Sequence, residues 1–477
     1  MPGIIRLSET VTLRLNTHSD TPDPSSLRIT IKPKMIRQAL VGITNTTEDG
    51  PLLDSVGDAC EASILPLTPG PTSPAPSHSP REIKRLPRRC PPGPFYRLGP
   101  AGEGTFSKII AVRDLRSKGG AGGRVLCLKV FEKEKLRNEG AERVVVQELR
   151  AFQTLTAAAH DKWLPFVMRM EASMEDTERI IFAMELMDCD LLTVMFDWEE
   201  EKVVKNKKRW IAEMATGIAA IHSAGIIHRD MKPENVLVDF ANTVRITDFG
   251  CSYVAYPAGR PLEPRTPYCS RVTGTIPYHS PEVMANKGIP REDKTEYGIA
   301  TDYWGLGCVI YELETCGEVK KTQDTIEPLF QTKEALDAYI NLRTPNNKKR
   351  YEPLEGLDED IFDLISGLLH PSPSSRYGER EVRCHDYFFN NNSRKSEFIG
   401  IEARGLALNT LPDKRDVPER VLYMEDPSDE EPNYSPVAYT PRGTQIGSDF
   451  SNVGWINPRG IWGPMHNDPA FYTTRPN

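Results

Sequence analysis

One short segment, HRDMKPEN at 228–235, constrains this chain more than any other part of its sequence. Asp230 and Asn235 stand five residues apart, and Asp248 follows eighteen residues after Asp230 within ITDFG. Asn235 and Asp248 carry hard oxygen ligands of the kind that Mg²⁺ takes together with phosphate oxygens. Asp230 then remains to accept a hydroxyl proton. Ion pairs in a buried loop are the structural alternative, but chance does not explain five polar positions in register with a second motif.

The order of these residues resembles the H-R-D-x-K-x-x-N and D-F-G motifs of the eukaryotic protein kinase family. The resemblance implies that ATP and Mg²⁺ are the cofactors, with Asn235 and Asp248 as metal ligands and Asp230 as the catalytic base. Lys232, within the same motif, is typical of serine/threonine kinases. The implied fold class is α+β. It has a small N-lobe of antiparallel strands with one main helix and a larger, mainly helical C-lobe, flanked by disordered tails.

A lysine on an upstream strand completes the catalytic set that the resemblance implies. Lys129 in LCLKV matches the lysine that holds the α- and β-phosphates. A buried lysine without a partner tends to lose its charge, so Lys129 needs a carboxylate. The predicted helix containing RVVVQELRAF offers Glu148, and Glu142 six residues earlier is the alternative. Glu148 is favoured because aliphatic and aromatic residues follow it, as in the family.

The segment GPAGEGTFSKI at 99–109 resembles the glycine-rich loop of kinases, with serine in place of the third glycine. FAMELMDCDLL resembles the strand and hinge behind the adenine, with Met184 as gatekeeper. The backbone of Glu185 and Met187 would bond the adenine edge, and Asp190 would bond a ribose hydroxyl. The positions implied to contact the nucleotide are Ala101, Gly102, Glu103, Gly104, Thr105, Phe106, Ser107, Ile109, Cys127, Lys129, Met184, Glu185, Met187 and Asp190.

Two further segments resemble scaffold motifs of the family. GTIPYHSPE at 274–282 matches the end of an activation loop, and its Glu282 is expected to pair with Arg376. Asp302 in TDYWGLG is expected to hold the catalytic loop from beneath. Thr275 agrees with serine/threonine specificity, so the expected partners are proteins with serine or threonine acceptors. The helix with FEKEKL and QELRAF favours AGC-type kinases, although their F-x-x-F tail motif is absent.

Regulation and substrate preference are predicted from single residues. In the family, the arginine before the catalytic aspartate binds a phosphate on the activation loop. Arg271 occupies the commonest register for that phosphate, so Ser270 and then Thr266 are the expected sites of an upstream kinase. Glu234 resembles an acidic residue of kinases that prefer basic substrates.

Composition divides the 477 residues into three parts. Residues 1–93 are polar and proline- and serine-rich, which predicts disorder. Residues 94–389 are expected to form the kinase domain, with an N-lobe at 94–185 and a C-lobe at 190–389. Residues 390–477 are expected to be a mostly disordered tail, in which only RVLYM and GWINPRGIW have the apolar content to pack.

The overall charge and cysteine pattern predict an intracellular protein. The formal net charge of −8 argues against nucleic acid as a partner. No apolar run approaches the roughly 20 residues of a membrane helix, and nine scattered cysteines are typical of free thiols in a reducing compartment. We expect the cytoplasm, with the nucleus as the alternative because REIKRLPRRC is basic. No feature predicts an oligomeric state.

A pseudokinase or scaffold, which keeps the fold and binds partners, is the alternative to an enzyme. Pseudokinases usually lack one member of the set Lys129, Asp230, Asn235 and Asp248. All four are present, which favours the enzyme.

Overall fold

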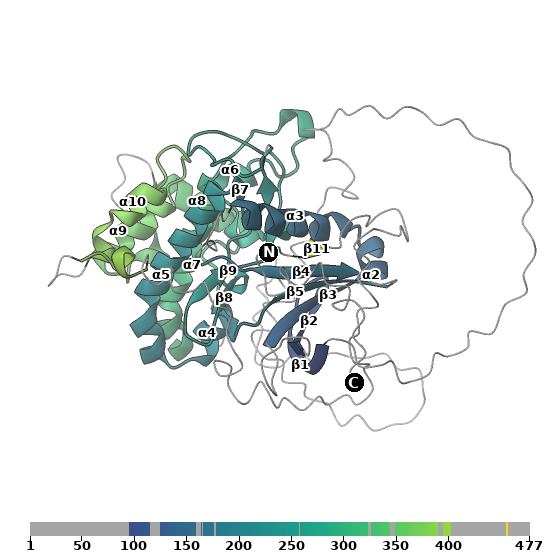
Figure 1. The fold of residues 1–477 in the computed structure, drawn as a ribbon. Coiled ribbons are helices and arrows are strands. Elements are labelled where there is room, and N and C mark those ends of the chain that lie inside the picture. Colours follow the sequence, from purple (N-terminus) through teal and green to yellow (C-terminus); the bar gives the residue numbers. More distant parts are fainter. Residues whose placement is uncertain are drawn as a thin grey trace, which may run out of the picture.

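The structure, a computed structural model, forms a β-rich lobe with one long helix and a larger helical lobe (Figure 1). The predicted α+β fold with these two lobes is confirmed. The predicted disordered segment 1–93 and the tail segment RVLYM lie outside the described residues. The described ranges are 95–114, 125–158, 164, 166–175, 178–256, 258–322, 326–343, 349–389, 395–401 and 455–456.

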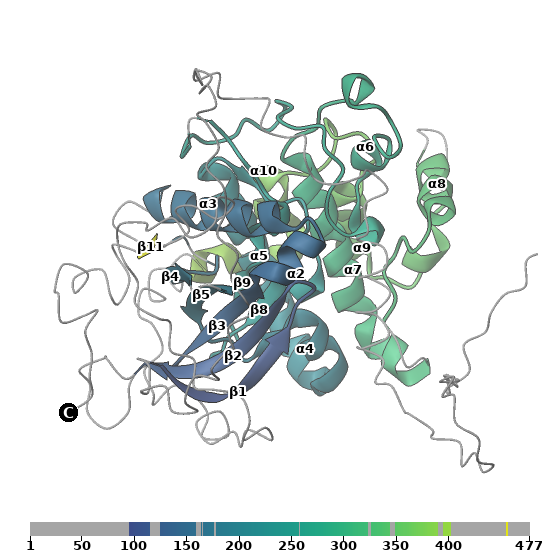
Figure 2. The same ribbon diagram turned by 90° about the vertical axis from the view of Figure 1, so that its right-hand side faces the viewer.

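The N-lobe is built on an antiparallel sheet with the strand order β1-β2-β3-β5-β4-β11. Its helix α3 lies across one face of the sheet (Figure 2). The elements of this lobe are β1 (Phe95–Glu103), β2 (Ser107–Asp114), β3 (Val125–Glu132), α2 (Lys133–Asn138), α3 (Glu142–Ala158), β4 (Met170–Glu175), β5 (Arg179–Glu185) and β11 (Trp455–Ile456).

Alternation along β3 separates the two faces of the sheet. Leu126, Leu128 and Val130 point into one apolar cluster together with side chains of β1, β2, β4 and β5. Cys127 packs in the larger core on the opposite face, and Lys129 follows it on that side because the side-chain period of a strand is two. The register of β3 therefore fixes the direction of the catalytic lysine.

The C-lobe carries most of the helices, and α7, α8 and α9 gather on the side away from the sheet (Figure 2). Helix α7 is buried along its centre, where Cys308, Val309 and Ile310 are fully covered. The helices and strands of the C-lobe are β6 (Cys189–Asp190), α4 (Leu191–Asp197), α5 (Glu200–Ser223), β7 (Ile226–Ile227), β8 (Val236–Val238), β9 (Val244–Ile246), β10 (Tyr253–Val254), α6 (Pro281–Met284), α7 (Ala300–Thr322), α8 (Lys333–Leu342), α9 (Glu359–Leu368) and α10 (Glu379–Arg383).

Short 3₁₀ turns mark the places where the C-lobe chain changes direction. Two of them, η1 and η2, carry residues of the catalytic and D-F-G motifs. The turns are η1 (Pro233–Asn235), η2 (Phe249–Cys251), η3 (Ile276–Tyr278), η4 (Arg291–Asp293), η5 (Glu352–Leu354) and η6 (Asp386–Phe388).

Two segments of the expected tail are packed against the domain. Trp455 and Ile456, from the predicted packing segment GWINPRGIW, pair with Ser173 and Ala172 at the open edge of β4. Residue Phe398 is buried, and its ring centroid lies 4.9 Å from that of Phe388. The packed part of the C-lobe therefore continues past residue 389.

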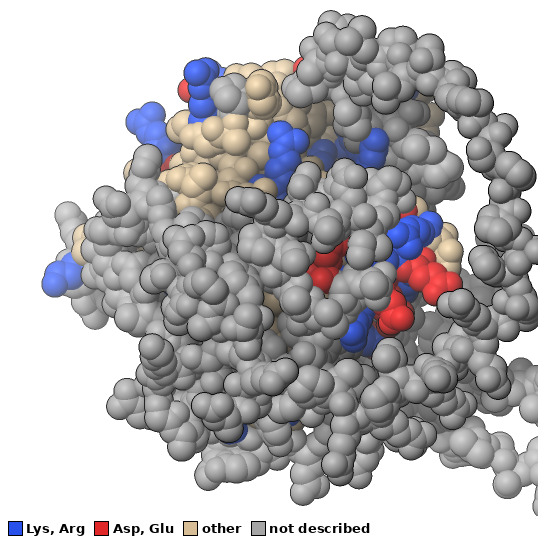
Figure 3. All heavy atoms as spheres, turned by 45° about the vertical axis from the view of Figure 1, so that its right-hand side comes forward, with Lys and Arg blue, Asp and Glu red and all other residues tan. Residues whose placement is uncertain are grey.

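The described surface mixes charges of both signs. On the face in Figure 3, acidic side chains lie beside basic ones among the described residues. Within the same ranges, none of the helices combines the length and apolar character needed to cross a bilayer.

Candidate active site

The catalytic loop follows β7 and is held by hydrogen bonds to both oxygens of Asp230. The amide Nδ2 of Asn235 donates to the Asp230 carbonyl at 2.7 Å and to Asp230 Oδ2 at 3.0 Å. The backbone N–H of Thr275 donates to Asp230 Oδ1 at 2.8 Å. Lys232 Nζ lies 3.2 Å from Asp230 Oδ2 and donates to Thr275 Oγ1 at 2.7 Å. The loop and the end of the activation segment thus form one polar cluster.

These contacts keep Asp230 ionised although it is buried. Burial opposes the charge, but the Lys232 ammonium and the hydrogen bond from Thr275 outweigh it and lower the pKa of Asp230. Burial also opposes the charge on Lys232, but Asp230 and other carboxylates raise its pKa. Asp230 is therefore a hydrogen-bond acceptor at neutral pH.

Beneath this loop, Asp302 holds a strained turn. Arg229 has φ 65°, a left-handed conformation that is costly for a residue with a side chain. Asp302 Oδ1 accepts from the Arg229 N–H at 2.7 Å, and Asp302 Oδ2 accepts from the His228 N–H at 2.8 Å. His222 Nε2 lies 2.8 Å from the same carboxylate. The expected support from beneath is present, and His222 is an additional partner that sequence reasoning missed.

The strand lysine, the helix glutamate and the D-F-G aspartate meet in the space between the lobes. Lys129 Nζ donates to the two oxygens of Glu148 at 2.7 and 2.9 Å and to Asp248 Oδ1 at 3.2 Å. Glu142 instead lies at the first turn of α3. The side chain of Glu148 is 1% exposed and that of Asp248 is 43% exposed, so Asp248 is accessible to a ligand.

The charges of this trio depend on one another. Burial opposes the charge on Lys129, but Asp248 and Glu148 outweigh it and raise its pKa. Burial raises the pKa of Glu148 to about 7, with Lys129 acting in the opposite direction. Burial also opposes ionisation of Asp248, but Lys129 and Lys232 lower its pKa.

A column of aromatic rings connects α3 to the catalytic loop. The ring centroids of Phe152 and Phe249 lie 5.2 Å apart, edge to face, and those of Phe249 and His228 also lie 5.2 Å apart. His228 Nε2 lies 2.8 Å from the Thr247 carbonyl. Helix α3, which carries Glu148, is therefore packed through Phe152 against the D-F-G turn.

The glycine-rich loop is a tight hairpin between β1 and β2. Gly104 N–H donates to the Ser107 carbonyl at 2.8 Å, and a Cβ on Gly104 would lie 2.9 Å from Ser107 Oγ. Ser107 is buried and is not among the described residues with positive φ, so serine fits without backbone strain. Residues Ala101, Gly102 and Glu103 end β1; Gly104, Thr105 and Phe106 form the turn; Ser107 and Ile109 begin β2.

The adenine side of the site is lined by β3 and β5. Cys127 pairs with Met184 in the sheet, and its thiol lies 3.4 Å from the Glu185 carbonyl, the group expected to bond adenine. Met184 and Met187 are buried. Asp190 Oδ1 accepts from Thr193 N–H at 2.7 Å and from Thr193 Oγ1 at 2.8 Å. Asp190 therefore also caps helix α4.

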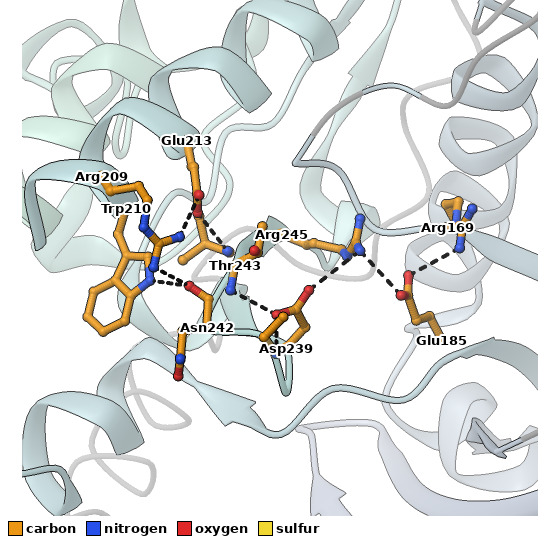
Figure 4. Close-up of polar contacts among 11 residues, drawn as sticks. Arg169, Glu185, Arg209, Trp210, Glu213, Asp239, Asn242, Thr243 and Arg245 are labelled. Carbon is orange, nitrogen blue, oxygen red and sulfur yellow. Dashed lines mark hydrogen bonds and ion pairs between the residues drawn. The ribbon is translucent and has the colours of Figure 1, made fainter. Parts of the chain in front are cut away.

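The side chain of Glu185 has a role that sequence reasoning missed. It is 2% exposed and faces Arg245 at 3.3 Å and Arg169 at 3.6 Å, and Arg245 in turn faces Asp239 (Figure 4). Glu185 and Arg245 are 60 residues apart in sequence, so no local motif could have indicated this contact.

The donor set fits Mg²⁺ bound together with phosphates. In the described ranges, no three His, Cys, Asp or Glu side chains converge as a metal site. Asn235 directs Nδ2 toward Asp230, which leaves its Oδ1 as the acceptor of that amide. Asp248 and Asn235 thus provide two hard oxygens, and substrate phosphates and water would complete the octahedron that Mg²⁺ requires.

Comparisons with known proteins agree with this geometry. The family model described as Protein kinase domain matches residues 95–388. RAC-beta serine/threonine-protein kinase A of Xenopus laevis is 30% identical over 305 residues, which cover 62% of this chain and 54% of the relative. G protein-coupled receptor kinase 1 of Caenorhabditis elegans is 28% identical over 310 residues, which cover 62% of this chain and 41% of the relative.

Rho-associated protein kinase let-502 of Caenorhabditis briggsae is 27% identical over 303 residues, covering 62% of this chain and 22% of the relative. The chain therefore spans about a fifth to about half of the length of these curated relatives.

Proposed function

Because this chain belongs to the protein kinase family, we propose that it transfers the γ-phosphate of MgATP to serine and threonine hydroxyls of protein substrates. The enzyme class, a serine/threonine kinase of AGC-like type, follows from the family and from the relatives. The observation that carries the proposal is the convergence of one complete set of polar groups. Lys129 reaches Asp248 at 3.2 Å, and Asn235 is bonded to Asp230 at 3.0 Å.

The mechanism relies on positioning and electrostatics. Bound MgATP supplies the phosphoryl group, and its metal neutralises phosphate charge. Asp230 accepts the proton of the substrate hydroxyl as that oxygen bonds to phosphorus and the bond to the leaving phosphate oxygen breaks. Glu148 keeps Lys129 directed at the phosphates, and the N–H of Thr275 keeps Asp230 in place.

Contacts around Lys232 support hydroxyl substrates of serine and threonine type. Lys232 bonds both Asp230 and Thr275, so its charge lies beside the position that the substrate hydroxyl would occupy. A preference for basic peptides is also part of the proposal, and it rests on the resemblance of Glu234, in η1, to an acidic residue of kinases with that preference. A peptide array without enrichment of arginine or lysine near the acceptor would contradict that preference.

The regulatory input and the location belong to the same proposal. Ser270 is half-buried and Thr266 is exposed on the activation segment, so both are accessible positions for an upstream kinase. A cytoplasmic location, with the nucleus as alternative, suits an enzyme with free thiols such as Cys127 and Cys251. The two sites can be tested by mass spectrometry of the active protein. Finding neither Ser270 nor Thr266 phosphorylated would contradict both assignments.

The test is transfer of labelled γ-phosphate to a protein substrate by wild type and Asp230→Asn. Loss of the general base should reduce kcat by about 10²–10⁴. Asp337→Asn, an exposed aspartate on α8, is the matched control and should retain wild-type activity. Equal transfer by wild type and Asp230→Asn would remove Asp230 as base. No transfer by wild type, with ATP bound, would favour the pseudokinase.

A further inference from the structure

A buried chain of charges runs from Arg169 through Glu185 and Arg245 to Asp239 (Figure 4). Glu185 Oε1 accepts from Arg245 Nη2 at 3.3 Å, and Glu185 Oε2 lies 3.6 Å from Arg169 Nη2. Arg245 Nη2 lies 3.7 Å from Asp239 Oδ2. Between 2% and 13% of each of these side chains is exposed. We refer to these four residues as the hinge network.

The hinge network joins elements that belong to different lobes. Glu185 ends β5, where the chain leaves the N-lobe sheet, whereas Arg245 lies in β9 of the C-lobe. Arg245 is three residues before the candidate metal ligand Asp248. Its partner Asp239 is fixed in turn, since Asp239 Oδ1 accepts from the backbone N–H of Thr243 at 2.8 Å. Glu185 is therefore tied to the strand that leads into the D-F-G turn.

Arg169 adds a second connection to the same strand. It directly follows a segment that pairs with β9, in which Met168 N–H donates to the Ile246 carbonyl and Ile246 N–H to the Phe166 carbonyl, both at 2.9 Å. Arg169 also precedes β4, which pairs with β5. The carboxylate of Glu185 thus lies between two guanidinium groups that are each anchored on β9.

Stability alone does not account for this arrangement. Burial removes four charges from water, and burial raises the pKa of Asp239 despite the nearby Arg245. Replacing a buried ion network by apolar side chains of similar volume is often neutral or stabilising, whereas such a network can specify geometry. The backbone that Glu185 carries is the part of the site expected to bond adenine, and its carbonyl already lies 3.4 Å from the Cys127 thiol.

We infer that Glu185 is a positioning residue for nucleotide binding, and this inference rests on the proposed function. Its carboxylate, held by Arg245 and Arg169, fixes the backbone of 185–187 relative to Asp248. A bound nucleotide would contact the backbone of 185–187 with its base and the region of Asp248 with its phosphates. Fixing the distance between these two ends therefore favours simultaneous contact.

The test compares nucleotide binding with stability in full-length protein. Glu185→Gln removes the carboxylate charge that Arg169 and Arg245 face. The combined variant Glu185→Leu, Arg169→Met, Arg245→Met, Asp239→Asn removes all four charges of the hinge network, retains the side-chain oxygen that accepts from Thr243, and should keep the wild-type Tm. Both variants should bind ATP at least about fivefold more weakly in a direct titration, with KM for ATP raised and KM for the peptide unchanged.

A neighbouring buried ion pair provides the control. Arg209 Nη1 donates to Glu213 Oε1 at 2.7 Å, in the same region but without contact to Glu185 (Figure 4). Arg209→Met should lower Tm and leave the Kd for ATP unchanged. If folded variants of the hinge network bind ATP as wild type does, the inference is wrong. If wild type itself binds no ATP, the proposed function fails and the inference fails with it.

Discussion

The ion pairs Lys129–Glu148 in the cleft and Arg376–Glu282 in the C-lobe are both buried, but their surroundings differ. Arg376 donates to both oxygens of Glu282, at 2.6 and 2.8 Å, which is a bidentate pair. Its guanidinium also donates to three backbone carbonyls, those of His370, Ala300 and Pro371. The charge and the hydrogen bonds of Arg376 are thus satisfied from within the fold, which identifies a structural pair.

The cleft pair is not balanced in this way. The single ammonium of Lys129 faces two carboxylates, Glu148 at 2.7 Å and Asp248 at 3.2 Å, and 43% of the Asp248 side chain is exposed. Burial raises the pKa of Glu148 to about 7, so its charge is only weakly maintained. The difference indicates that the cleft is arranged to receive further charged groups, whereas the C-lobe pair is complete without any.

The largest effect is expected when the complete pair is broken. Arg376→Met removes five hydrogen bonds and leaves the Glu282 carboxylate without its bidentate partner. We expect the free energy of unfolding to fall by about 3–5 kcal/mol, measured by urea denaturation. A loss below about 1 kcal/mol would show that Arg376 and Glu282 do not hold the C-lobe together.

The cleft pair should respond mainly in activity. Glu148→Gln keeps the shape of the side chain but removes the charge that directs Lys129. We expect kcat/KM to fall by about 10²-fold while Tm changes little. Glu142→Gln, on the half-buried first turn of α3, is the matched control and should behave as wild type. Equal losses for the two variants would contradict the assignment of Glu148.

Glu148→Gln should also change how kcat/KM depends on pH. Because the pKa of Glu148 is raised to about 7, the carboxyl is increasingly protonated below that pH and no longer attracts Lys129 as an anion. Wild-type kcat/KM should therefore decrease as pH falls through about 7. Glu148→Gln has no titrating group at this position, so this acidic limb should be absent. If kcat/KM of Glu148→Gln decreases at acidic pH as it does in wild type, the decrease arises from a group other than Glu148.

Residues in short motifs could be predicted from the sequence, whereas contacts between distant segments could not. Lys129, Asp230, Asn235 and Asp248 lie in short motifs, where spacing and resemblance are sufficient to identify them. The choice of Glu148 over Glu142 followed from the residues around it, and the structure pairs Glu148 with Lys129.

Contacts between distant segments had no such local signal. The guanidinium of Arg245 meets Glu185 only because β9 and the hinge are adjacent in the fold, and Trp455–Ile456 reaches β4 from far along the chain. The segments themselves carry sequence signals, since Glu185 lies in the hinge segment, Arg245 just before ITDFG, and Trp455–Ile456 in a segment expected to pack. Which of these segments meet in the fold is revealed only by the packing.

The smallest effect is expected for an ion pair that is exposed. Arg383 Nε donates to Glu379 Oε1 at 3.0 Å on α10, with 28% and 52% of the side chains exposed. Water and salt screen such a pair, and Glu379→Gln removes it while leaving the Arg383 guanidinium over the ring of Phe398, so this variant should lower the free energy of unfolding by only about 0.3–0.5 kcal/mol. Urea denaturation at low and high salt should show this small difference disappearing as salt rises. A loss comparable to that of Arg376→Met would mean that pairing itself, rather than burial and complete hydrogen bonding, determines the stability of the C-lobe.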